Sequence, residues 1–299
     1  MANKLVAAFD VGGTSVKAAL LDEDLTVVER LREPTARSDD GATTAELVVD
    51  QIARLTERMG AVAAAGVVVP GIVDEDAGIA RFSANLGWRE VPLGALLAQR
   101  LPVPVAFGHD VTAGGLAEFR LGAARGFSGA VVIPVGTGIA GALLLDGRPY
   151  RAGGQAGEIG HIDVGHELRC GCGAIGCLEA IASASAIARR FRDRTGRAAE
   201  GGQQVVDAAR AGDADAAVVL KEALEALAKG IHTLVTLLAP EVVVLGGGLF
   251  AAGPFVLDPV RERLSSTLTF QRMPELRVAE LGDEAGNLGA GLMALELAR

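Results

Sequence analysis

Residues 5–21 read Leu5-Val-Ala-Ala-Phe-Asp10-Val-Gly-Gly-Thr14-Ser-Val-Lys17-Ala-Ala-Leu-Leu21: an apolar run, a loop with two adjacent glycines and a second apolar run. The pattern predicts two strands joined at residues 10–14. Since a strand and not a helix follows the glycines, the loop is neither a Walker loop nor a dinucleotide-binding fingerprint. Its bare backbone N–H groups, the Thr14 hydroxyl and the Lys17 cation could form an anion cradle, with an ordinary Gly-Gly hairpin turn as the alternative.

The second half of the chain repeats this arrangement. Predicted strands at residues 130–135 and 140–145 flank Gly136-Thr137-Gly138, and the apolar strand at 242–245 leads into Gly246-Gly247-Gly248. Helices are predicted at residues 43–59, 93–101, 111–121, 183–194, 203–211, 213–239 and from 288 onward, with Thr43 and Asp213 as N-caps. Strands mixed with helices predict α/β layers, and two similar halves suggest a duplicated fold with a cleft between them. Open α/β sheets bind ligands at strand ends, where these glycine loops fall.

All three cysteines lie between residues 170 and 177, in a segment that begins Gly157-Glu158-Ile159-Gly160-His161. With His161, Cys170, Cys172 and Cys177 make a complete tetrahedral shell for a structural zinc ion. The alternatives are buried thiols or a Cys170–Cys177 disulfide, which would leave one thiol unpaired. His166 is a rival fourth ligand, although a solvated loop histidine is the preferred interpretation for it.

Composition narrows the class of protein. The chain has 299 residues, half of them hydrophobic, which indicates a substantial core and two domains rather than one. A net charge of −9 without a basic tract disfavours a nucleic-acid partner. Clustered cysteines and too short an apolar stretch before Asp10 for a signal peptide indicate the cytoplasm. The uncharged run at 126–145 is broken by Pro134, Gly136, Gly138 and Gly141, so it is expected to form strands rather than a membrane helix.

Three carboxylates could act on a polyol. Asp110 follows an apolar strand and precedes a helix, where it is either a helix N-cap or a general base. Glu158 and Glu179 lie in the cysteine segment and could accept hydrogen bonds from hydroxyl groups, although each alone is more often a surface acid. His161 could bind a metal through one ring nitrogen and donate to a substrate oxygen from the other. Asp10 could hold a metal-bound water beside phosphates.

Taken in order, these motifs closely resemble the ROK family of repressors and sugar kinases, within the actin-like ATPase superfamily. The resemblance runs from about residue 4 to the end and rests on Asp10–Lys17, Val69-Pro-Gly71, Asn85-Leu-Gly-Trp88, Asp110, Gly136-Thr-Gly138, Gly157–His161 and Cys170–Glu179. It implies a two-domain, ribonuclease H-like α/β fold with an active-site cleft between the domains. The expected domains are residues 1–110, joined by the helix at 288–299, and residues 111–287 with the zinc segment.

The resemblance also implies roles for single residues. The ATP phosphates, with magnesium, would be bound by Asp10, Gly12, Gly13, Thr14, Lys17, Gly136, Thr137 and Gly138, and the adenosine would lie near Gly247 and Gly248. Asp110 would take the proton from the 6-hydroxyl of a hexose. The sugar would be held by Gly71, Asn85, His109, Asp110, Glu158, His161 and Glu179. Zinc on His161 and the three cysteines would be structural. A homodimer or homotetramer is expected on the same ground.

The chain departs from the family pattern at one position, His109, where the kinases usually carry an asparagine that contacts the sugar. From the resemblance as a whole we predict an ATP-dependent hexose kinase that acts on glucose or a related hexose. Because of His109, the sequence leaves open which hexose is preferred. It also leaves open whether polyphosphate can replace ATP. One alternative is a catalytically weak or silent sugar-binding member with a sensing role. A sugar-sensing repressor is disfavoured, because the first strand begins almost at once and the chain is acidic.

Overall fold

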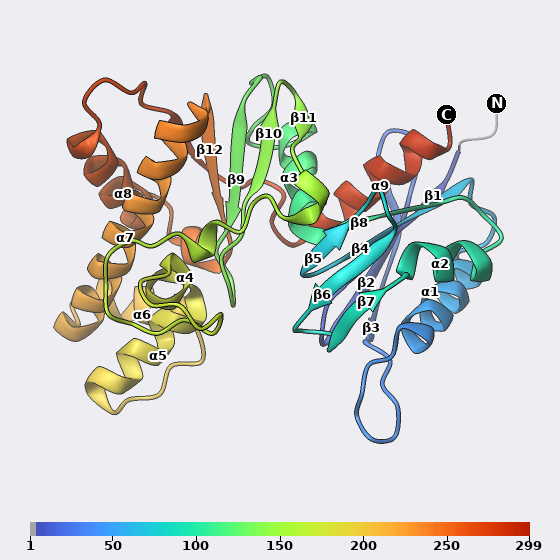
Figure 1. Cartoon of the computed structure of the whole chain (residues 1–299), viewed down its shortest axis with the longest axis horizontal. Coiled ribbons are helices and arrows are strands. Elements are labelled where there is room, and N and C mark those ends of the chain that lie inside the picture. Colours follow the sequence, from blue (N-terminus) through green and yellow to red (C-terminus); the bar gives the residue numbers. More distant parts are fainter. Residues whose placement is uncertain (1–3) are drawn as a thin grey trace. The chain divides into compact units, whose positions relative to one another are not determined.

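The computed structural model describes residues 4–299. Met1, Ala2 and Asn3, which the predicted first domain includes, lie outside the described residues. The chain forms two compact units (Figure 1). Unit 1 holds the residues up to Ala117, Tyr150–Ala156 and Asp283–Arg299, and unit 2 holds Glu118–Pro149 and Gly157–Gly282. The predicted domains stay a prediction; by their contacts, residues 111–117, 150–156 and 283–287 belong to unit 1.

A five-stranded sheet forms the centre of unit 1. Its strands lie in the order β3 (Val27–Pro34), β2 (Ser15–Leu21), β1 (Val6–Val11), β4 (Ala64–Val69) and β8 (Val105–His109). Strands β1, β2 and β3 are antiparallel neighbours, whereas β4 and β8 run parallel to β1. A separate three-stranded sheet contains β5 (Ile72–Asp74), β6 (Ile79–Ser83) and β7 (Trp88–Val91).

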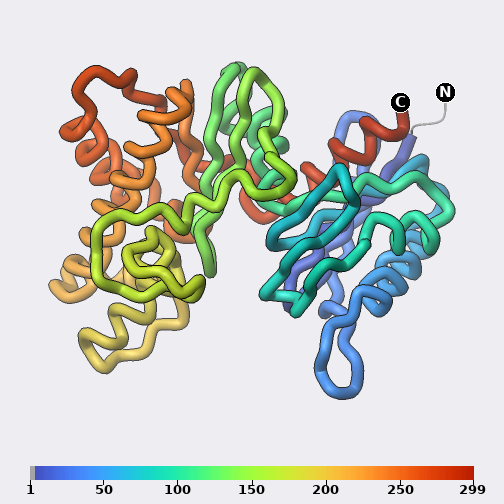
Figure 2. Tube along the Cα trace, viewed as in Figure 1, coloured from blue at the N-terminus to red at the C-terminus, as the bar shows by residue number. Residues whose placement is uncertain are grey.

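Both faces of the central strand β1 are buried, which explains its unbroken apolar sequence. Ala7, Phe9 and Val11 point into a core shared with α1 (Ala45–Met59) and α2 (Leu93–Arg100). Val6 and Ala8, on the opposite face, pack against α9 (Ala285–Leu297). The first strand and the last helix, β1 and α9, therefore come together in unit 1 (Figure 2).

Helix α9 lies unusually close to its neighbours because small residues line the contact. A Cβ atom on Gly66 of β4 would come within 1.9 Å of the Ala290 carbonyl oxygen. A Cβ on Gly289 would come within 2.1 Å of the Ala113 carbonyl oxygen in α3 (Asp110–Arg120). Backbone therefore packs on backbone at both positions, which fixes the start of α9 relative to the sheet and α3.

Unit 2 has a sheet of the same topology. Its order is β11 (Arg148–Pro149), β10 (Ala142–Leu145), β9 (Ala130–Pro134), β12 (Val242–Gly246) and β13 (Glu275–Val278). Strands β9, β10 and β11 are antiparallel, and β12 and β13 run parallel to β9. An antiparallel meander followed by two parallel strands thus occurs in both units, and the prediction of a duplicated α/β fold is confirmed.

The helices of unit 2 pack around its longest helix. They are α4 (Leu178–Ala182), α5 (Ala184–Thr195), α6 (Gly202–Arg210), α7 (Ala214–Leu238) and α8 (Pro254–Thr267). Helix α7 contacts the other four. Its Asp213 side chain accepts a hydrogen bond from the Ala216 N–H, as the sequence predicted. Within residues 4–299, no helix combines the length and the apolarity needed to cross a membrane.

Local patterns located most elements but missed those with little periodicity. The predicted N-cap of α1 is wrong by one position: Thr44 accepts the Leu47 N–H, while the Thr43 carbonyl accepts the Trp88 indole N–H. Strands β5, β6, β7 and β13 and helix α8 were not predicted. These strands are short and helix α8 contains Pro259, so none carries a clear repeat of apolar residues.

The contact of α9 with β4 gives the first testable prediction. Gly66→Ala places a methyl group where the Ala290 backbone lies, so we expect the free energy of unfolding to fall by about 1–3 kcal/mol or more. Urea denaturation measures the change. Gly201→Ala is the matched control, because its added Cβ meets nothing within 4 Å and its φ is −167°. Equal stabilities of the two variants would contradict the close packing of α9.

Candidate active site

The loop between β1 and β2 is held in place by hydrogen bonds to its carbonyl oxygens. The Thr35 hydroxyl donates to the Gly12 carbonyl at 2.6 Å, and the Thr35 N–H donates to the Thr14 carbonyl at 3.1 Å. Arg37 donates to the Gly13 carbonyl at 2.8 Å. Neither glycine has a positive φ, so the turn conformation does not require glycine. The limited space at position 13 does require glycine, since a Cβ on Gly13 would come within 2.7 Å of the Asn85 carbonyl oxygen.

Asp10 is the penultimate residue of β1 and lies beside Lys17, with 3.7 Å between Asp10 Oδ2 and the Lys17 ammonium. A Cβ on Gly286, in the first turn of α9, would lie 2.8 Å from the same carboxylate oxygen. Burial and then the charge of Asp110 raise the pKa of Asp10 to about 6, against the lowering effect of Lys17. Asp283 raises it further. Negative charge thus exceeds positive charge around Asp10, and hard oxygen ligands of this kind suit magnesium.

Asp110 opens α3 directly after β8. Its Oδ1 accepts the Val111 N–H at 2.7 Å and lies 3.1 Å from His109 Nε2. His109 Nδ1 lies 3.1 Å from the Thr112 hydroxyl. Among residues 4–299, the hydrogen bonds to this carboxylate engage only Oδ1, so Oδ2 is the oxygen available to a substrate hydroxyl.

An ion pair between a mostly buried glutamate and a partly exposed arginine supports the junction between β8 and α3. Glu75 Oε1 accepts the His109 N–H at 3.3 Å, and Glu75 Oε2 lies 2.5 Å from Arg151 Nε. Burial is the main cause that raises the pKa of Glu75 above its usual range, although Arg151 opposes the shift. Position 108 is crowded, because a Cβ there would lie 3.1 Å from Glu75 Oε1 and closer still to the Met293 side chain.

In unit 2, Glu179 connects the Gly136-Thr137-Gly138 loop to the cysteine segment. Its Oε2 accepts the Ile139 N–H at 2.8 Å and would lie 2.5 Å from a Cβ on Gly138. Glu179 belongs to the first turn of α4, whose N-cap is Cys177. The loop itself is closed by a hydrogen bond from the Gly136 N–H to the Gly138 carbonyl at 3.0 Å. Two groups predicted separately from the sequence are therefore in direct contact.

His161 faces a carboxylate on one side and sulfur on the other. It ends the short 3₁₀ helix η2 (Ile159–His161), which follows Glu158. His161 Nε2 lies 3.8 Å from Glu158 Oε2, and both side chains are more than one-third exposed. His161 Nδ1 lies 3.7 Å from Cys170 Sγ. The ring is thus oriented so that its two nitrogens face different groups.

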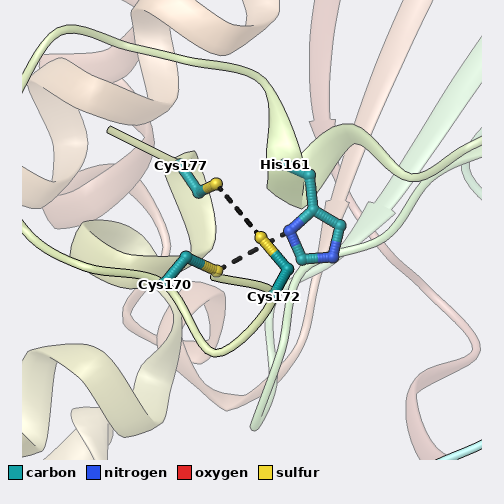
Figure 3. A group of neighbouring side chains, drawn as sticks. All are labelled: His161, Cys170, Cys172 and Cys177. Atoms are coloured by element: carbon teal, nitrogen blue, oxygen red, sulfur yellow. Dashed lines mark hydrogen bonds between the residues drawn. The ribbon is translucent and has the colours of Figure 1, made fainter. Parts of the chain in front are cut away.

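His161, Cys170, Cys172 and Cys177 form a cluster in which the four ligand atoms lie within 4.8 Å of one another (Figure 3). Cys172 Sγ and Cys177 Sγ are 3.7 Å apart, and all three thiols are free of disulfides. Sulfur ligands about 2.3 Å from a tetrahedral zinc ion would be separated by about 3.8 Å. The spacing therefore fits a tetrahedral metal centre and does not fit a disulfide.

His166 is not part of this cluster. Its Nδ1 accepts the Leu168 N–H at 3.0 Å, so Nε2 carries the proton and donates to the Cys177 carbonyl at 3.0 Å. Both ring nitrogens are therefore used to hold the loop. His166 is neither a ligand in this arrangement nor a simply solvated side chain.

Two of the remaining predicted glycines have conformational reasons for their presence. Gly71 and Gly247 have φ values of 110° and 94°, and a Cβ on either would lie 2.1 Å from a backbone oxygen. Gly248, in contrast, meets nothing within 4 Å and opens the 3₁₀ helix η3 (Gly248–Ala252). Gly71 and Asn85 lie in unit 1, close to the three-stranded sheet and to Gly13, respectively.

A comparison with known proteins places this geometry in a family. The family model described as "ROK family" matches residues 6–297. The chain belongs to the ROK family. This ROK protein is 32% identical to the glucokinase of Halalkalibacterium halodurans over 97% of its own length and 95% of the relative's.

Two crystal structures are also similar to this ROK protein. One is the ROK hexokinase of Thermus thermophilus, with 33% identity, a TM-score of 0.83, and coverage of 98% of this chain and 99% of that chain. The other is the ROK glucokinase of Streptomyces griseus in complex with glucose and AMPPNP, with 29% identity, a TM-score of 0.82, and the same coverage. The expected two-domain actin-like fold is confirmed by these likenesses.

Sequence reasoning missed three residues of the ROK protein that surround its predicted site in unit 1. Glu75 supports the His109 backbone, Thr112 contacts the His109 ring, and Arg151 pairs with Glu75. Arg151 lies far along the chain from the other two, and no motif spacing marks any of them. The only local signal was that Thr112 stands three positions after His109, within one helical turn.

The raised pKa of Asp10 predicts a pH-dependent stability. Its ionised form is disfavoured in the folded ROK protein, so above pH 6 the charge should destabilise the fold. Protonation removes this effect as the pH falls from about 6 to 4. We expect Asp10→Asn to raise the free energy of unfolding by about 1–3 kcal/mol at pH 8, and the gain to fade near pH 4.

Thermal and urea unfolding of the two proteins between pH 4 and 8, without added divalent cations, measures this dependence. Asp24→Asn, at an exposed position, is the control and should change little at any pH. A difference between Asp10→Asn and wild type that does not vary with pH would contradict the raised pKa.

Proposed function

We propose that this ROK protein is an ATP-dependent kinase that phosphorylates the 6-hydroxyl of glucose or a closely related hexose. The observation that carries the proposal is Asp110, whose Oδ1 is held by the Val111 N–H and whose Oδ2 is available to a hydroxyl. Likeness to glucokinases over nearly the whole chain supports the same reaction and favours it over a repressor.

In the proposed reaction, Asp110 accepts the proton of the sugar hydroxyl while the hydroxyl oxygen attacks the γ-phosphorus of ATP. The bond from the γ-phosphorus to the β,γ-bridging oxygen breaks, and ADP leaves. Such a transfer depends mainly on positioning and on neutralising charge. Lys17, Thr14 and the N–H groups of the Gly12-Gly13 loop would bind phosphate oxygens. A magnesium ion held through Asp10 would supply further charge neutralisation on the phosphates.

The proposed roles of unit 2 follow from its loops. Gly136, Thr137 and Gly138 would bind phosphate, and Gly247 and Gly248 would face the adenosine. The carboxylates of Glu158 and Glu179 would accept hydrogen bonds from ring hydroxyls of the sugar, and the His161 ring would donate one to a hydroxyl oxygen of the sugar. In unit 1, Gly71 and Asn85 would complete the sugar contacts.

We also propose that the metal in the cluster of His161 and the three cysteines is zinc. Three sulfurs and one imidazole nitrogen at tetrahedral spacing are the donor set that zinc prefers. Burial and then the neighbouring Cys172 thiol raise the pKa of Cys177 to about 12 in the metal-free protein. Binding of zinc would therefore release protons, and its affinity should fall as the pH is lowered. The role is structural, since Cys177 caps the helix that carries Glu179.

The proposal includes a cellular setting. Reduced metal-binding thiols and ATP as the phosphoryl donor are typical of the cytoplasm. We propose that the protein is cytoplasmic and forms a homodimer or homotetramer. Sedimentation equilibrium would measure the number of chains in the assembly directly.

The zinc proposal predicts one zinc ion per chain after washing with chelator. Cys172→Ser should lose the metal, lower the melting temperature and weaken sugar binding, because the segment with Glu158 and Glu179 loosens. Elemental analysis, calorimetry and sugar titration give the three measurements. His166→Gln is the control and should keep the metal. Retention of zinc in Cys172→Ser, or its loss in His166→Gln, would show that the ligand set is wrong.

The proposed base gives a prediction that separates catalysis from helix capping. Asp110→Asn keeps a side-chain oxygen able to cap the helix but removes the base. We expect turnover to fall by about 10²–10⁴-fold while the melting temperature and nucleotide affinity stay close to wild type. A coupled assay over a panel of hexoses measures turnover.

Asp213→Ala is the matched control, since Asp213 caps α7 through the Ala216 N–H. It should lower the melting temperature and leave turnover per folded molecule unchanged. Full turnover in Asp110→Asn, with a loss of stability only in Asp110→Ala, would reduce Asp110 to a helix cap.

A further inference from the structure

The His109 side chain contacts two neighbouring side chains rather than projecting freely. Its Nδ1 lies 3.1 Å from the Thr112 hydroxyl, and its Nε2 lies 3.1 Å from Asp110 Oδ1. The side chain is only 15% exposed. A neutral imidazole has one donor and one acceptor nitrogen. Here Nδ1 is hydrogen-bonded to Thr112 and Nε2 faces Asp110 Oδ1, so each ring nitrogen already has a polar neighbour within the protein.

These contacts specify the tautomer of His109. An ionised Asp110 accepts hydrogen bonds only, so the proton belongs on Nε2, which faces Asp110 Oδ1. Nδ1 must then accept, and the Thr112 hydroxyl donates to it. Asp110 therefore sets the tautomer, and Thr112, through its hydrogen bond to Nδ1, holds the orientation in which the ring presents an N–H to the carboxylate, in the way a third group orients a catalytic pair.

The backbone on either side of this chain of contacts is also held. The His109 N–H donates to the buried Glu75, which is paired with Arg151. On the other side, Asp110 and Thr112 belong to the first turn of α3, which packs closely against α9 through Ala113. His109 and Thr112 thus have little freedom to move away from Asp110.

We propose that His109 is a positioning residue for Asp110 and not a ligand of the sugar. This positioning role rests on the proposed kinase function. Thr112 holds the His109 ring, the ring N–H stabilises the charge on Oδ1, and the carboxylate is kept with Oδ2 toward the reacting hydroxyl. Without the ring, Asp110 would keep only the Val111 N–H and could rotate about its side-chain bonds. The departure from asparagine then alters how the base is held and leaves the choice of hexose to other residues.

Kinetics of three single variants and one double variant test the proposal. His109→Phe removes both ring contacts, and Thr112→Val removes the hydroxyl without changing side-chain shape. We expect each to lower kcat by about 10- to 100-fold, because Asp110 either loses its polar neighbour His109 or has that ring held less firmly once its hydrogen bond to Thr112 is gone. The hexose KM of each variant should stay within about twofold of the wild-type value. The kcat of the double variant His109→Phe/Thr112→Val should be no lower than that of the single variant with the lower kcat. His109→Asn should lower kcat without changing the ranking of hexoses.

The opposite pattern would overturn the proposal. If His109 binds the sugar, His109→Phe raises the hexose KM, His109→Asn changes the ranking of hexoses, and Thr112→Val has no effect. Thr56→Val is the matched control, because the buried Thr56 hydroxyl bonds only within its own helix, to the Ile52 carbonyl. It should leave kcat unchanged.

A measurement without substrate separates this inference from the kinase proposal. Nitrogen-15 NMR of the histidine rings in the full chain should show His109 as the Nε2–H tautomer, and the Nδ1 resonance should shift in Thr112→Val because its hydrogen bond is lost. A wild-type Nδ1–H tautomer, or an Nδ1 resonance unaffected by Thr112→Val, would overturn the positioning role even in an active kinase. Absence of hexose phosphorylation by the wild type would instead overturn the proposed function, whatever the tautomer.

Discussion

The close contact of α9 with the sheet of unit 1 is the constraint on which the site there depends. Gly66 and Gly289 let the backbone of α9 touch that of β4 and α3, and no side chain lies between them. The same approach places Gly286 against Asp10, so the first turn of α9 becomes a wall of the site. Because α3 begins at Asp110, one packing interaction fixes the helix that carries the proposed base and the surroundings of the carboxylate on β1.

Charge in this region is arranged for function rather than for stability. Asp10 is buried beside Asp110 with Lys17 as its near cation, which is why its pKa is raised to about 6. A buried carboxylate with a like charge nearby destabilises a fold unless a cation joins it. Magnesium and the phosphates of a nucleotide would complete this balance. The neighbouring pair of Glu75 and Arg151 shows the opposite solution, in which a buried charge has a permanent partner.

Unit 2 organises its polar groups through a single segment. Cys177 belongs to the metal cluster and is also the N-cap of α4, whose first turn carries Glu179. Glu179 in turn bonds the Ile139 N–H beside the Gly136–Gly138 loop. A metal ion would therefore hold the proposed sugar-binding and phosphate-binding groups of this unit through a short run of backbone. This explains why cysteines, glycines and carboxylates occur so close together in the sequence.

The sequence by itself determined the features that depend on neighbouring residues. These are the strand–loop–strand element at residues 5–21, the capped helix after Asp213, the duplicated order of elements and the cysteine cluster. Tertiary structure alone decided which histidine joins that cluster, because His161 and His166 differ only in what the fold brings to their rings. It also decided that His109 contacts Asp110 and Thr112, and that Arg151 reaches Glu75 from a distant part of the chain. Periodicity and spacing report local geometry, whereas the partner of a polar side chain is set by packing between segments far apart in sequence.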